Sequence, residues 1–250
     1  MSYAPSPDNL LIGRGKVYFD IYENGQRTGE IPFGQVDSFG LTIQDELREK
    51  YETMTHASGL YNVVPVKRQV TLNLVGSEYN LDNLALANLG LRSVINQTAG
   101  TVTDETVTAS AKLGRFYALT HRKVSNVVVT VGSATKVEGT DYTVDAVTGR
   151  IYIVPTGSIT EGSTVVVDYS YAAATLQVID GGKAKKIEAF VRYVGDPAAG
   201  PAYEVQVYKA MLTPNGELGL ITDDFGQFTL TGKVLAAGPA DSPFYRVISL

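Results

Sequence analysis

Alternation of apolar and polar side chains is the strongest pattern along the chain, and it is typical of β-strands. In residues 16–21, for example, Val17, Phe19 and Ile21 occupy every second position. Runs of β-branched residues at 127–131 and 165–167 predict strands that are covered on both faces. The same two-residue period recurs at 70–74, 203–207 and 228–230, and turn signals lie at Asn24-Gly25, Thr148-Gly149 and Pro214-Asn215-Gly216.

One short helix is predicted between residues 80 and 90. Ser77 or Asn80 is a suitable N-cap, Asp82 favours the first turn, and Gly90 is a natural stop. The apolar residues expected on its buried face are Leu81, Leu84, Ala85 and Leu89.

The middle of the chain reads as a separate β-rich block. Four short strands are expected in residues 122–173, at 127–131, 142–144, 150–154 and 164–171. A block of this size is marginal alone, so it is either an inserted subdomain or an elaborated hairpin that depends on its host. We therefore expect an N-terminal arm at 1–12, a main β domain formed by 13–121 and 174–250, and an inserted block at 122–173.

Composition narrows the functional classes. With 44% hydrophobic and 19% charged residues the chain is expected to fold, and a net charge of −5 disfavours a protein that grips nucleic acid. The absence of cysteine excludes disulfides and thiolate metal sites. Residues 1–9 lack the pattern of a signal peptide, and no apolar stretch approaches the roughly 20 residues of a membrane span, which predicts a soluble protein.

No catalytic, cofactor-binding or metal-binding residues are predicted. The two histidines, His56 and His121, lie near no nucleophile motif, so surface or interface roles are favoured. The Gly13–Lys16 run lacks the spacing and the following helix of a phosphate loop. We therefore expect neither an enzyme nor a cofactor.

Three acidic residues in the middle block invite comparison with a calcium site. Glu138, Asp141 and Asp145 do not have the spacing of an EF-hand loop. We interpret them instead as solvated carboxylates at strand edges, where charge discourages sheet-to-sheet association.

A charged segment, residues 44–58, separates two strand-like runs and looks less regular than its surroundings. Such a segment is a candidate inter-subunit or inter-ring loop that becomes ordered against a neighbour. The candidate residues are Gln44, Asp45, Glu46, Arg48, Glu49, Lys50, Glu52 and His56.

Several short motifs, in order and spacing, resemble the tail-tube (major tail) proteins of siphophages. They span most of the chain, although the insert is absent from the shortest family members. The motifs are Gly13–Asp20, Gly29-Glu30, Phe39–Ile43, the acidic run Asp45–Glu52, Ser58–Leu60, Asn83–Ala87 with Gly90, Gly139–Asp145 with Gly149–Ile151, Pro214–Leu218, Asp224–Gly226 and Thr231–Leu235.

The resemblance implies a mainly β protein: a tail-tube β-sandwich or barrel with one short flanking α-helix and an Ig-like or hairpin β insert. It further implies self-assembly into hexameric rings that stack into a hollow tube, in a virion assembled in the bacterial host cytoplasm. The implied partners are other copies of the chain, a tape-measure protein, a tail terminator and distal tail or baseplate proteins. DNA would pass through the lumen without specific binding, and no membrane is involved.

A hypothesis about the lumen follows from the need for DNA to slide. Asp45, Glu46, Glu49 and Glu52 are candidate lumen acids, because a polar or negative wall does not retain phosphate.

Alternative functions stay open at this stage. A secreted β-sandwich adhesin or carbohydrate-binding module is favoured by the Ig-like block and by the 15 tyrosines, although the chain contains no tryptophan. A tube protein of a type VI-like secretion system is a third possibility. An enzyme comes last, because no acid, base and nucleophile can be named together.

Overall fold

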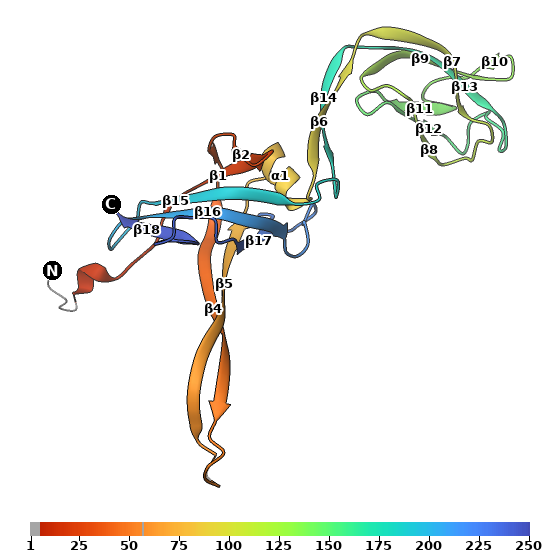
Figure 1. The fold of residues 1–250 in the computed structure, drawn as a ribbon. Coiled ribbons are helices and arrows are strands. Elements are labelled where there is room, and N and C mark those ends of the chain that lie inside the picture. Colours follow the sequence, from red (N-terminus) through yellow and green to blue (C-terminus); the bar gives the residue numbers. More distant parts are fainter. Residues whose placement is uncertain (1–5, 57) are drawn as a thin grey trace. The chain divides into compact units, whose positions relative to one another are not determined.

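The computed structural model describes residues 6–56 and 58–250, so Met1–Pro5 of the predicted arm lie outside the described residues. The chain is mainly β with one short helix, as expected from the alternation pattern. It divides into two compact units (Figure 1): residues 1–92 with 179–250, and residues 93–178.

The first unit is built on one antiparallel sheet, which has nine strands in the described part of the chain, in the order β2-β1-β15-β16-β17-β5-β4, with β18 on β16 and β3 on β1. Its elements are η1 (Pro7–Asn9), β1 (Gly15–Glu23), β2 (Gln26–Arg27), β3 (Ile31–Pro32), β4 (Val36–Tyr51), β5 (Leu60–Gly76), α1 (Leu81–Ala87), β15 (Ile187–Gly195), β16 (Tyr203–Pro214), β17 (Phe228–Val234) and β18 (Tyr245–Ser249).

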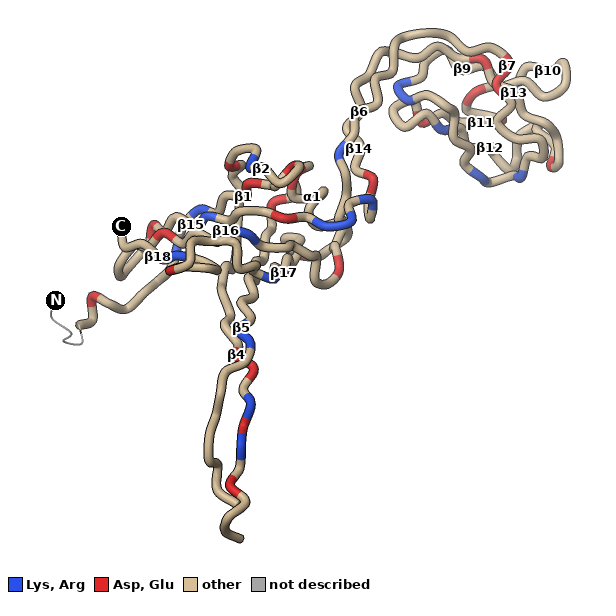
Figure 2. The backbone as a smooth tube through the Cα atoms, in the orientation of Figure 1, with Lys and Arg blue, Asp and Glu red and all other residues tan. Residues whose placement is uncertain are grey.

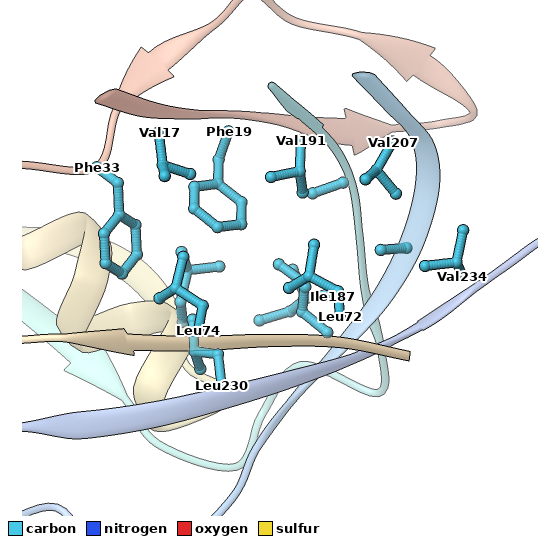
Figure 3. Packing of buried hydrophobic residues seen from close by; sticks show 14 of the residues in the cluster. Val17, Phe19, Phe33, Leu72, Leu74, Ile187, Val191, Val207, Leu230 and Val234 are labelled. Carbon is cyan, nitrogen blue, oxygen red and sulfur yellow. The ribbon is translucent and has the colours of Figure 1, made fainter. Parts of the chain in front are cut away.

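The sheet curls so that its two halves pack face to face. Val17 and Phe19 of β1 share one buried cluster with Leu72 and Leu74 of β5, although three strands separate β1 from β5 in the sheet. Figure 3 shows these side chains meeting between the two layers. The alternating residues of 16–21 and 70–74 thus line a sandwich-like core, as their period predicts.

A turn and a helix N-cap are found at residues that the sequence predicts for them. Asn24 and Gly25 both have positive φ and join β1 to β2 in a tight turn. Asn80 caps α1 by accepting a hydrogen bond from the Asn83 backbone N–H at 2.8 Å. The buried Asn83 amide then donates to the Phe33 carbonyl at 2.7 Å, which ties the helix to the segment before β4.

The predicted apolar face of the helix is partly wrong. Leu81 is exposed, whereas Leu86 and Ala87 enter the core cluster. The helix has only seven residues, and its C-terminal turn is the part that meets the core, which shifts the buried face. Leu89, not Gly90, takes the positive φ that ends the helix, and the Gly90 N–H bonds to the Ala85 carbonyl.

The second unit is a two-sheet sandwich with its own core. One sheet has the order β10-β9-β13-β7 and the other β11-β12-β8. The strands are β7 (Gly100–Thr108), β8 (Phe116–Ala118), β9 (Val124–Val131), β10 (Ala134–Thr135), β11 (Tyr142–Asp145), β12 (Arg150–Ile153) and β13 (Val165–Tyr171). The chain enters and leaves through the paired strands β6 (Leu91–Gln97) and β14 (Ala174–Asp180).

The boundaries predicted for the inserted block, 122–173, differ from those of this unit. The unit begins at Ser93 because β7 pairs with β13 and β8 pairs with β12, so residues 100–118 complete its two sheets. Residues 93–121 therefore belong to the insert, and the main unit resumes at Ile179.

Separate cores predict separate losses of stability. Leu72 and Ile151 are each fully buried, Leu72 in the first unit and Ile151 in the second. Truncating either to alanine should cost about 2–5 kcal/mol of unfolding free energy. Ile151→Ala should lower hydrogen-exchange protection only in residues 93–178, and Leu72→Ala only outside them. Equal loss of protection in both units would show that they unfold as one.

Candidate interaction surface

The β4–β5 hairpin extends far beyond the sheet to which it belongs. β17 pairs with β5 only over residues 70–76, whereas β4 and β5 stay paired out to Tyr51 and Leu60. Every residue of β4 from Thr42 onward and of β5 up to Gln69 is at least one-third exposed, whereas Leu41 packs against the core. Figure 1 shows this ribbon leaving the curled sheet of the first unit. An isolated two-stranded ribbon is only marginally stable in water, so we expect a further contact to stabilise this one.

This arrangement corrects the prediction of an irregular segment at 44–58. Gln44–Tyr51 continues β4, and Ala57, within the same predicted segment, lies outside the described residues. The charged side chains are compatible with strand because they pair across the ribbon. Asp45 lies opposite Arg68 and receives two hydrogen bonds from its guanidinium, both at 2.7 Å, while Glu46 lies opposite Lys67.

One face of the ribbon carries most of its apolar side chains. Side chains alternate along β4, so positions 43, 47 and 51 point to the same side as Leu41, which packs against the core. The register adds their partners from β5. This apolar hairpin face comprises Ile43, Leu47, Tyr51, Leu60, Val63 and Pro65.

The side chains of this face have no cover within the described residues. Ile43, Leu47 and Tyr51 are about half exposed, at 51%, 51% and 50%. The core pattern of the sheet therefore continues onto a ribbon that has no second layer. Contiguous exposed apolar surface of this kind marks an interaction site.

The opposite face is polar, and the predicted site residues divide between the two. Gln44, Glu46, Arg48 and Lys50 lie on the polar face, whereas Asp45 and Glu49 interrupt the apolar hairpin face. Glu52 and His56 follow the strand and are not buried. The Tyr51 hydroxyl donates to Glu49 at 2.7 Å, and the Arg68 guanidinium lowers the pKa of Asp45.

The four candidate lumen acids do not create a negative surface on the hairpin. Residues 42–71 contain four carboxylates and four Lys or Arg side chains. Figure 2 shows the two signs interspersed along the ribbon. The hairpin is therefore neutral overall, and its polar face neither binds phosphate tightly nor repels it strongly.

A second exposed feature of the first unit is a groove of about 680 Å³ at the base of the hairpin. Phe39 of β4 lines it and stacks on Tyr193 of β15, with ring centroids 5.5 Å apart. Val205 and Val247 line it from β16 and β18. The outer backbone edge of β4 borders this groove and has no partner strand among the described residues.

The second unit contains a polar cluster that the sequence did not reveal. The His121 ring stacks on Tyr171 at 3.7 Å between centroids, and its Nδ1 lies 2.9 Å from the Tyr169 hydroxyl. That hydroxyl donates to Glu105, whose other oxygen accepts from Thr120. Pairing across β7 and β13, which sequence spacing does not give, brings these groups together.

The cluster is not arranged for nucleophilic chemistry. Burial and the hydrogen bond to Glu105 raise the pKa of Tyr169, so its hydroxyl stays protonated at neutral pH. Because the hydroxyl donates its proton to the hydrogen bond with Glu105, it accepts from His121 Nδ1 in the tautomer that carries a proton on that nitrogen. A recess of about 380 Å³ beside the ring is lined by Ile95, Arg122 and Tyr171.

Two of the three acids compared with a calcium site, Asp141 and Asp145, have structural roles that the solvated-edge interpretation missed, whereas Glu138 is exposed, as that interpretation expects. Asp141 is buried and accepts hydrogen bonds from the backbone N–H groups of Val137 and Ser158, which lower its pKa. Asp145 closes the turn before β12. In the described part of the chain, no group of three or more His, Cys, Asp or Glu is placed to hold a metal ion.

Comparison with known proteins identifies a family whose description names no activity. A family model described as "Protein of unknown function UCP028589" matches residues 10–247. No curated protein matches the chain. Within residues 6–56 and 58–250, no helix combines the length and the apolar character needed to cross a membrane.

Acid should weaken the second unit through Asp145. The Thr148 hydroxyl and the Arg150 guanidinium donate to this carboxylate and lower its pKa from 3.8 to about 2. Because the folded-state pKa is depressed, the stabilisation is present above pH about 4 and is lost as the pH falls through about 2. Asp145→Asn should reduce the loss of stability of this unit between pH about 4 and pH about 2. Hydrogen exchange of residues 93–178 measures that loss. Glu161→Gln, at an exposed carboxylate of the same unit, should leave that loss unchanged; a similar reduction would contradict the assignment.

Proposed function

Since the chain belongs to this family, whose description names no activity, we propose from its own features that it is a structural protein that assembles with copies of itself. The single observation that carries the proposal is the apolar hairpin face, which continues a core pattern beyond the core and has no cover in the described chain. Self-association removes this surface from water, which is the main driving force for obligate assembly.

The unpaired backbone edges support the same proposal. Within residues 6–56 and 58–250, β4 has no partner strand on its outer side, and β5 lacks one over residues 60–69. Long exposed edges invite strand addition, and proteins that keep them normally use them. Pro65 and the charges of β4 limit uncontrolled pairing along the same edges.

The specific form of assembly that we propose is the tail tube of a long-tailed bacteriophage. The ordered motifs from Gly13 to Leu235 resemble tail-tube proteins, and the mainly β fold with one short flanking helix is compatible with them. Six copies would close a ring through a head-to-tail contact, and rings would stack into an open filament because the separate ring-to-ring contact need not close. The tape-measure protein, the tail terminator and distal tail or baseplate proteins are the proposed further partners, in a virion assembled in the host cytoplasm.

Passage of DNA fits the charge of the chain. A protein with a net charge of −5 and a neutral hairpin has no basic stripe to retain phosphate. If Asp45, Glu46, Glu49 and Glu52 lie on or near the lumen, they and their basic neighbours form a polar wall. Intact assembly and DNA delivery after reversal of all four charges would end that assignment.

One observation favours a second function. The second unit is a two-sheet sandwich with its own core and an aromatic-lined recess beside His121 and Tyr171. A β-sandwich adhesin or carbohydrate-binding module would use such a recess, because sugar rings pack on aromatic faces. A glycan screen with the wild type and with Tyr171→Ala separates this function from assembly.

Assembly through the hairpin predicts opposite behaviour for two neighbouring positions. Leu47 lies on the apolar hairpin face, and Val64 lies on the polar face opposite Arg48. Leu47→Asp places a charge in the contact and should raise the concentration at which rings or tubes form at least about tenfold. Val64→Asp pairs its new charge with Arg48 and should assemble like the wild type. Light scattering across a concentration series, with electron microscopy of the products, measures both.

The wild type decides the proposal as a whole. Hollow tubes or rings with sixfold symmetry are the expected products. A chain that remains monomeric at every concentration, and also with tail-initiator proteins present, would contradict assembly and leave the binding module as the better candidate.

A further inference from the structure

The groove at the base of the hairpin and the apolar hairpin face lie on the same unit but cannot cover each other in one molecule. Phe39 forms part of the groove wall, and Leu47 lies on the same strand, β4. β4 and β5 stay paired out to Tyr51 and Leu60, so the ladder carries the face away from the groove at its base. Figure 1 shows the hairpin extending from the sheet. Two apolar surfaces held apart in one chain can be buried against each other only between two copies.

We propose that the groove of one copy receives the apolar hairpin face of a second copy. This inference rests on the proposed function, since it names the surface that accepts the hairpin during assembly. Each copy contributes one hairpin and one groove, which makes the contact head-to-tail rather than self-complementary. A contact of this kind leaves a free hairpin at one end and a free groove at the other, so it continues until rotation closes a ring.

The chemistry of the two surfaces agrees. Val205, Val247 and Leu11 give the groove aliphatic lining, and Leu11 and Val247 are more than half exposed, at 56% and 52%. Arg14 and Asp37 are the charged residues of the lining and have opposite signs. Residues 42–71 of the hairpin are also neutral overall, so neither surface brings a net charge to the contact.

The unpaired edge of β4 adds directionality. Its residues 36–41 run beside the groove with their outer backbone groups free of strand partners in the described chain. An extended segment lying in the groove can bond to this edge while its alternate side chains enter the apolar recess. The hairpin presents extended backbone and alternate apolar side chains in the same element.

Mixing two defective variants tests the inference. Leu47→Asp disables the hairpin and keeps the groove, and Val247→Asp does the reverse. Each variant alone should stay monomeric at concentrations at which the wild type assembles. An equal mixture should form a 1:1 dimer of twice the 26.8 kDa chain mass and stop there, because only one intact hairpin and one intact groove are present. Light scattering coupled to size exclusion measures the masses.

Controls separate the inference from the proposed function. Val147→Asp changes an exposed valine of the second unit and should assemble like the wild type. If Val247→Asp and Leu11→Asp both assemble normally, the groove is not the acceptor, although hairpin-driven assembly stands. A mixture that remains monomeric also overturns the hairpin–groove pairing. A wild type that never assembles overturns both inferences.

A second measurement does not depend on charge substitutions. The chain has no cysteine, so Leu47→Cys and Val247→Cys introduce the only thiols, one on each surface. A short bis-maleimide should cross-link a mixture of these two variants into a dimer. The variant pair Val64→Cys and Val247→Cys should give at least about tenfold less product; equal yields would mean that the hairpin does not enter the groove by its apolar face.

Discussion

Cross-strand pairing between β4 and β5 is the interaction on which the interpretation of this chain depends. It holds 16- and 17-residue strands together far past the point where the sheet ends. Backbone hydrogen bonds satisfy only the inner edges of this ribbon beyond the sheet, and no other described part of the chain covers its outer edges or its faces. A ribbon of this kind is only marginally stable in a lone chain, which is why we interpret it as one half of a contact.

The sequence predicted the elements in which a local pattern and a local signal agree. Residues 16–21 and 70–74 alternate, and both line the core. Asn24 and Gly25 form a turn because the turn requires positive φ at both positions and these residue types adopt it readily. Asn80 caps the helix because its side chain accepts a hydrogen bond from a backbone N–H. These outcomes depend on a few neighbouring residues.

The strand at 45–51, the start of the insert, the groove and the His121 cluster were missed for a different reason. Each depends on pairing between residues that are far apart in the sequence. The run from Asp45 to Glu52 looked irregular because its charges hide the alternation, and only the partner residues Lys67 and Arg68 make those charges compatible with a strand. The start of the insert was missed because β7 has no internal signal that it pairs with β13. The groove and the His121 cluster likewise depend on register between strands far apart in sequence. A single sequence does not contain that register.

The way in which the second unit joins the chain has a practical consequence. The chain leaves the first unit in β6 and returns in β14, and these two strands are paired with each other. The exit and re-entry points are therefore neighbours, and the core of the first unit draws no residue from positions 93–178. Such a junction accepts any folded unit whose own ends lie close together. Residues 93–178 thus mark a natural position for gain, loss or exchange of a whole module, whether by evolution or by a protein engineer seeking to display cargo on the first unit.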